Sequence, residues 1–202
     1  MRSIQNHFFK ILIFIIIICN SCGKPCGNEN IVLCEAHPLY LKYFGPFKVG
    51  NHWIYETEDS SQRDSLFVEI VSKAGSKLNE ETCEQYSSFS FVGMIFNSGN
   101  NFRLLNSAFK HLNSCNDGII SFYYNLNGNE KISIFITNTI SSDNAEIIPE
   151  ILLNNTMYTD VLHIYVDQRE YFFAPQIGLI RYIISDSLNS PVIHNLKTYY
   201  IQ

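Results

Sequence analysis

The chain has 202 residues, of which 46% are hydrophobic, 14% aromatic and only 16% charged, and its formal net charge is −5. This composition excludes intrinsic disorder, which needs low hydrophobicity and high net charge, and the 14 basic residues form no cluster typical of a nucleic-acid binder. The length predicts one domain with a sizeable core, and six cysteines at this length indicate an exported protein.

The chain begins with the pattern of a secretory signal peptide. Arg2 and Lys10 provide positive charge without any acid, and an unbroken apolar run follows over residues 11–19. This run is shorter than the roughly 20 apolar residues that span a bilayer. We therefore predict a signal peptide over residues 1–21, with a retained membrane anchor as the alternative. Cleavage there leaves 12 basic residues against 19 acidic ones, a net charge of −7.

A small residue, Ser21, stands directly before Cys22, and this arrangement resembles the lipobox of bacterial lipoproteins. The family usually has an aliphatic residue three positions before the cysteine, where this chain has Cys19. The resemblance implies that Cys22 carries lipid such as palmitate and that residues 22–42 are a lipidated cysteine and tether. It also implies an exported protein at the bacterial outer membrane, on the periplasmic face or the cell surface. The alternative is an ordinary secreted protein with Cys22 in a disulfide.

Four cysteines, Cys26, Cys34, Cys83 and Cys115, remain beyond Cys22 and are predicted to form disulfides, because an even number in an exported chain indicates pairing. Proximity in the sequence favours Cys26–Cys34, which leaves Cys83–Cys115. A zinc site is the alternative. The spacing of these four cysteines and of the scattered histidines does not favour it.

The chain from residue 43 to 202 is predicted to be one antiparallel β domain. Short alternating or aromatic-rich runs recur between turn residues, and Asn127-Gly128 is a typical hairpin turn. The expected strands, in chain order, are residues 52–56, 65–71, 83–96, 102–109, 119–126, 131–139, 158–166, 171–173, 179–185 and 194–201.

Two segments are less regular. Residues 145–153 are the best helix candidate, but Pro149 interrupts them, so we expect this helix to be short or absent. Residues 31–43 are ambiguous because Pro38 breaks the run. The predicted fold class is mainly β, a single antiparallel curved sheet or partly closed barrel with few or no long helices.

Three blocks of the β domain resemble a group of lipoproteins without an assigned activity that is common in Bacteroidetes. Residues 43–55 follow the group's pattern of tyrosine, Phe-Pro, Gly-Asn, tryptophan and tyrosine, with Gly45 as an insertion. Residues 157–162 match a Tyr-x-Asp-Val element, and residues 171–181 match a segment with Phe-Ala-Pro and Gly-Leu. The resemblance implies an antiparallel, partly closed β sheet, and it implies no activity.

Physical reasoning gives these blocks a structural role. Trp53 and Tyr55 supply large apolar area, so we expect them in the core. Pro175 cannot donate to a strand ladder and Gly178 permits a bend, which predicts a bulged or sharply turned strand pair. Turn chemistry explains Asp160 better than a carboxylate pair for acid–base work.

No motif for catalysis, metal binding or a cofactor stands out, so we expect no enzyme, no metal and no cofactor. The expected function is that of a membrane-anchored exported lipoprotein. Its β domain would act as a binding or carrier module for an apolar ligand, a glycan or a partner on an aromatic-lined concave face. The alternative is a structural or assembly lipoprotein that pairs with other envelope proteins through its edge strands. The expected partners are the membrane, through an N-terminal lipid anchor, and an apolar ligand or envelope protein, with no nucleic acid.

Overall fold

The structure is a computed structural model of the chain. It describes residues 26–27, 30–96, 102–112, 114–123, 131–137, 139–166, 168–186 and 189–202. The predicted signal peptide, Cys22 and the hairpin turn at Asn127-Gly128 lie outside these residues. Within them, no helix is long and apolar enough to cross a membrane.

The fold is mainly β, as the sequence predicts, and the described residues contain one short helix, α2 (Pro38–Phe44). The strands are β1 (Val32–Cys34), β2 (His52–Thr57), β3 (Arg63–Asn79), β4 (Glu84–Phe96), β5 (Phe102–His111), β6 (Gly118–Tyr123), β7 (Lys131–Ile136), β8 (Ile140–Ser141), β9 (Ala145–Leu153), β10 (Thr156–Val166), β11 (Arg169–Ala174), β12 (Gly178–Asp186) and β13 (Asn189–Tyr200).

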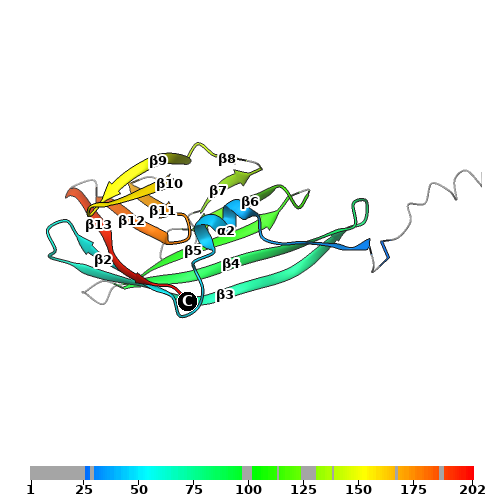
Figure 1. Cartoon of the computed structure of the whole chain (residues 1–202), viewed down its shortest axis with the longest axis horizontal. Helices are drawn as coiled ribbons and strands as arrows, with labels where there is room; N and C mark the ends of the chain where they lie inside the picture. The colour runs from blue at the N-terminus through cyan, green and yellow to red at the C-terminus, as the bar shows by residue number, and fades with distance from the viewer. Residues whose placement is uncertain are drawn as a thin grey trace, which may run out of the picture.

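The strands form one sheet in the order β8-β7-β6-β5-β4-β3-β2-β13-β12-β11-β10-β9, in which all neighbours are antiparallel. β1 lies off this path and pairs in parallel with the start of β4. The two edge strands, β8 and β9, are joined by a short turn in which Ser142 bridges Ala145. The sheet is therefore curved into a nearly closed barrel, with β9 and β10 on one side and β3 and β4 on the other (Figure 1).

Helix α2 lies between the two sides of the curved sheet (Figure 1), and aromatic side chains from α2 and the segment after it pack against the strands. Phe44 on α2 packs 5.0 Å from Phe173 on β11, measured between ring centroids. Phe47 stacks 4.2 Å from Phe91 on β4 and 4.8 Å from Trp53 on β2. All five rings are buried, so the core joins the two halves of the sheet through α2.

The structure gives both of the less regular segments a definite conformation. Residues 145–153 form strand β9, which pairs with β10 along its length. Pro149 is tolerated there because β9 is an edge strand, where a missing N–H breaks no ladder.

The described part of the expected tether, residues 30–42, belongs to the folded domain. Pro38 starts α2 instead of breaking an element, because proline suits the first turn of a helix. His37 caps this helix, accepting the N–H of Leu39 on its Nδ1 at 3.2 Å.

Candidate functional site

Two of the resembling blocks are joined by hydrogen bonds in the core. The Trp53 indole donates to the carbonyl of Ile177 at 2.7 Å, and the Tyr55 hydroxyl donates to the carbonyl of Leu179 at 3.0 Å. Both aromatic side chains are fully buried. Complete burial raises the pKa of the Tyr55 hydroxyl well above its ordinary value, so it remains a donor. These residues therefore hold the fold together and are closed to a ligand.

Asp160 links the third block to helix α2. Its backbone has φ +53°, and its carbonyl accepts a hydrogen bond from the Tyr43 hydroxyl at 2.9 Å. Its exposed carboxylate lies 3.4 Å from Nζ of Lys42. A surface ion pair of this kind contributes little, about 0–1 kcal/mol. The contacts of Asp160 in the structure are thus with the helix.

Pro175 and Gly178 lie at the tight connection between β11 and β12. Residues 175–177 form the turn, and Gly178 has φ +88°. A register shift between Phe172 and Phe173 precedes it, so a bulge and a sharp turn occur together in this strand pair.

All four described cysteines are in disulfides, but the pairing differs from the expected one. Cys26 is bonded to Cys83, with 5.5 Å between their Cα atoms, and Cys34 to Cys115, with 5.1 Å between theirs. Proximity in the sequence was misleading because the two long-range bonds fasten the N-terminal segment to the β3–β4 turn and the β5–β6 loop. Cys22 lies outside the described residues.

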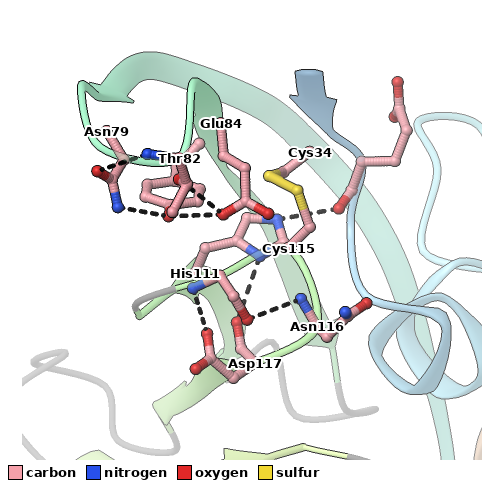
Figure 2. Close-up of a disulfide and its surroundings, with 11 residues drawn as sticks. Cys34, Asn79, Thr82, Glu84, His111, Cys115, Asn116 and Asp117 are labelled. Atoms are coloured by element: carbon pink, nitrogen blue, oxygen red, sulfur yellow. Dashed lines mark hydrogen bonds between the residues drawn. A yellow bond between two sulfur atoms is a disulfide. The ribbon is translucent and has the colours of Figure 1, made fainter. Parts of the chain in front are cut away.

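The described residues bring together one group with metal-ligand chemistry, Cys34, Glu84 and Cys115, whose ligand atoms lie within 4.8 Å of one another (Figure 2). Both sulfur atoms are bonded to each other, so neither is available there as a thiolate ligand. Glu84 accepts hydrogen bonds from Thr82 at 3.2 Å and from Tyr86 at 2.9 Å. This carboxylate is therefore engaged in the local structure.

A buried polar cluster joins β3, β12 and β13. Asp64 accepts a hydrogen bond from the Tyr182 hydroxyl through Oδ2, and this oxygen lies 3.4 Å from His194 Nδ1. The rings of Tyr182 and His194 stack 4.4 Å apart. Oδ1 of Asp64 has no hydrogen-bond partner among the described residues. Carboxylate, imidazole and phenol are the groups of acid–base chemistry, but all three are at most 4% exposed, so we assign them a structural role.

An open groove of about 880 Å³ lies where the β9–β10 turn approaches β13 and the β2–β3 loop. The turn residues Asn154 and Asn155 both have positive φ, which asparagine tolerates. The Asn154 side-chain amide donates to the carbonyl of Leu196 on β13 at 3.1 Å. This contact fastens the hairpin end against β13 and forms one wall of the groove. We call this open groove the Arg181 groove, after one of the residues that line it.

Cross-strand neighbours on the outer face of the sheet supply another part of the lining. Arg181 on β12 is opposite Asn195 on β13, which is opposite Glu56 on β2. Arg181 faces outward because its neighbour Tyr182 is buried in the core. Its Nε donates to Oδ1 of Asn195 at 2.7 Å, and Nζ of Lys197 lies 3.1 Å from Oε2 of Glu56.

The charges that line the groove cancel. Two acids, Glu56 and Glu58, face two bases, Arg181 and Lys197, and the Arg181 guanidinium lies 3.6 Å from Glu58. Partial burial lowers the pKa of Arg181, while the Glu58 carboxylate opposes this shift. Hydrogen bonds from Arg63, which has the larger effect, and from Lys197 lower the pKa of Glu56. At neutral pH the groove therefore carries charge without a net excess, which favours a polar ligand of low net charge.

Two tyrosines add aromatic surface to this polar lining. Tyr199 on β13 is 45% exposed, and Tyr158 on β10 is half-buried. Burial raises the pKa of Tyr158, and the nearby Tyr199 hydroxyl adds to the shift. The Tyr158 hydroxyl is therefore protonated at neutral pH. Each of the two tyrosines offers an apolar ring with a polar tip.

Sequence reasoning missed the groove because its residues come from four separated segments. Arg181 lies inside the block 171–181, which was interpreted as structural. The signal in the sequence is the charge of Arg181 between the apolar residues Ile180 and Tyr182, because strand alternation predicts that Arg181 faces away from the core. The Asn154-Asn155 turn was a second signal for a tight hairpin.

Comparisons with known proteins leave the site to be assigned from its geometry. No family model and no curated protein matches the chain. A crystal structure described as that of a "putative lipoprotein" from Parabacteroides distasonis matches with a TM-score of 0.39 and 10% sequence identity. The match covers 79% of this chain and 99% of that chain.

Proposed function

We propose that the protein is a membrane-anchored lipoprotein whose β domain binds a neutral, glycan-like ligand in the Arg181 groove. The observation that carries the proposal is the groove lining, in which paired charges and amides surround two tyrosine rings. Its volume of about 880 Å³ falls within the range typical of small-ligand sites. Hydroxyl groups would pair with Asn195 and Arg181, and the C–H face of a sugar ring would pack on Tyr199.

The filled interior directs the proposal to the Arg181 groove. A carrier for an apolar ligand needs space on the concave face of the sheet. Phe44, Phe47 and Trp53 occupy that space and stack on one another. An apolar ligand would have to displace these rings, which dominate the core.

The edge strands give less support to the alternative function of assembly by strand pairing. β8 has only two residues, and β9 carries Pro149 together with the exposed acids Glu146 and Glu150. Short strands, proline and charge are features by which proteins protect an edge from pairing. The groove is therefore the better-supported binding surface.

Titration calorimetry with neutral hexasaccharides of glucose, xylose and N-acetylglucosamine tests the groove. We expect at least one series to bind, and we expect Tyr199→Ala to weaken that binding at least 10-fold by removing the ring surface. Tyr200→Ala is the matched control, because Tyr200 is similarly exposed but stacks on His52 away from the groove. Equal losses in both variants, or no binding by any probe, would overturn the proposed ligand class.

The lipid anchor is tested separately. We expect the chain expressed in bacteria to incorporate a palmitate analogue and the Cys22→Ala variant to lose the label. A label that persists in Cys22→Ala would show that the anchor assignment is wrong.

A further inference from the structure

We infer that the end of the molecule formed by β1 and the β3–β4 turn rests against the lipid bilayer, so that the Arg181 groove opens at the far end. This inference rests on the lipid anchor of the proposed function. It concerns the orientation of the domain and the surface that contacts lipid, neither of which follows from the anchor alone.

The first step is the short connection between lipid and domain. Cys22 and Cys26 are four residues apart, and an extended chain of that length spans at most about 14 Å. Cys26 is bonded to Cys83, which lies in the turn between β3 and β4. The disulfide thus holds the β3–β4 turn within about 20 Å of the residue that carries the acyl chains. Without it, the next fixed point would be β1, several residues further along.

The second step is the fixation of β1 on the same end of the fold. β1 pairs with residues 84–86 of β4, directly after the turn, and the Cys34–Cys115 disulfide fastens its last residue. His111 on β5 lies beside this disulfide (Figure 2). Its Nε2 lies 2.9 Å from the backbone carbonyl of Glu35, which adds a link between β5 and the residue after β1. Residues 32–35, between Cys26 and α2, are therefore held against the sheet.

The third step is the apolar surface at this end. Val32 and Leu33, consecutive residues of β1, are 55% and 62% exposed. Val32 and Leu33 point to opposite faces of β1. Each of these exposed side chains lies close to the acyl anchor and would gain from leaving water on entering the headgroup boundary. Glu80 and Glu81 are exposed at the neighbouring turn, so attraction to anionic lipids does not contribute. The contact fits the acyl boundary of a zwitterionic bilayer.

The fourth step is the distance to the groove. β3 runs from Arg63, whose partner Glu56 lines the groove, to Asn79 beside the β3–β4 turn. Its 17 residues span about 50 Å at the rise of a strand. The β3–β4 turn lies at one end of the long axis, and the ends of β2 and of the β9–β10 hairpin lie towards the other (Figure 1). A membrane contact at the turn therefore leaves the groove open to the surrounding solution.

Tryptophan quenching by lipids tests the orientation. The lipidated chain is reconstituted in phosphatidylcholine vesicles with or without brominated acyl chains, as the wild type, as Leu33→Trp and as Val192→Trp. The single native tryptophan, Trp53, is fully buried and gives the background. Val192 is the control because it is also exposed but lies on β13 near the β2–β3 loop. We expect brominated lipid to reduce the added fluorescence of Leu33→Trp at least twofold and to leave Val192→Trp unchanged.

The outcomes separate the orientation from the anchor. If the variants float with the vesicles but Leu33→Trp is not quenched, or if both variants are quenched alike, the orientation is overturned and the anchor stands. If the wild-type chain does not float, the anchor itself fails and the orientation fails with it. Stronger quenching of Leu33→Trp when part of the lipid is replaced by phosphatidylglycerol would contradict an apolar contact. Calorimetry of the groove tests the ligand independently of all these results.

Discussion

Gly178 shows at the scale of one residue how two sequence blocks constrain each other. Its φ of +88° favours glycine, and a Cβ added there would lie 3.0 Å from Cε2 of Phe47 and 3.5 Å from Cζ2 of Trp53. We expect Gly178→Ala to lower the free energy of unfolding by about 2–3 kcal/mol. The cost of a positive φ adds to the cost of crowding the new Cβ against Phe47. Urea unfolding measures this loss.

Gly50 provides the matched control for this prediction. It has a similar φ of +94°, but a Cβ there would meet only the Gln202 side chain at 3.8 Å. Gly50→Ala should therefore cost only the backbone strain, about 1 kcal/mol. Equal losses at the two glycines would show that the aromatic contacts of Gly178 do not matter.

Single residues also show what the sequence could predict. The burial of Trp53 and Tyr55 was predictable, because large aromatics on alternating positions of a strand require a core. The burial of Asp64 was not, since an aspartate in sequence is expected on the surface. Its partner Tyr182 is 118 residues away, and only the strand order of the curved sheet brings the two together.

The β2–β3 turn shows at the scale of an element how one carboxylate stabilises a wall of the groove. Asp59 Oδ1 accepts hydrogen bonds from the Thr57 hydroxyl and from the backbone and side chain of Ser61. These hydrogen bonds lower the pKa of Asp59 to about 2 from its ordinary 3.8. The bond from Thr57 contributes most, followed by those from Ser61. A depressed pKa in the folded state means that this stabilisation is present above about pH 4 and is lost as pH falls to about 2.

The corresponding prediction concerns Asp59→Asn. We expect the variant to be less stable than the wild type at pH 6 and the difference to shrink towards zero as pH falls from 4 to 2. Denaturant unfolding of both proteins at each pH measures the difference. A difference that stays constant over this range would contradict the role of the ionised carboxylate.

Elements that depend on long-range pairing were predicted less well than local ones. The run 145–153 contains Pro149, which gave no clear local preference, and its strand conformation comes from the ladder with β10. Helix α2 begins at Pro38, where a proline equally suits a break or a helix start. Packing of Phe44 against Phe91 and Phe173 of the sheet favours the helix start.

At the scale of the whole molecule, two disulfides fasten the N-terminal segment to the sheet. Cys34 and Cys115 are separated by 81 residues, so their bond removes a large loop entropy from the unfolded chain. We expect the double variant Cys34→Ala/Cys115→Ala to lose about 4 kcal/mol of unfolding free energy. Denaturant unfolding against the wild type measures the loss. A loss below about 1 kcal/mol would show that β1 and His111 hold this end without the bond.

The groove also belongs to the scale of the whole molecule. Its lining comes from β2, the β2–β3 loop, the β9–β10 hairpin, β12 and β13, which no local pattern connects. Because β2 and β13 are neighbours only through the sheet order, residues 56 and 195 pair although 138 residues lie between them in the chain. The charge balance of the groove is thus a property of the assembled sheet.

The sequence by itself determined that this chain is mainly β, because alternating aromatic and aliphatic runs between turn residues can bury only one face of a strand. It also determined which cysteines pair off, although not with which partner, because pairing depends on which segments meet in space. The tertiary structure alone decided that α2 and Phe47 fill the concave face, since shape and volume govern packing. It likewise decided that a polar groove forms beside β2, β12 and β13, because only the strand order of the sheet brings Glu56, Arg181 and Asn195 side by side.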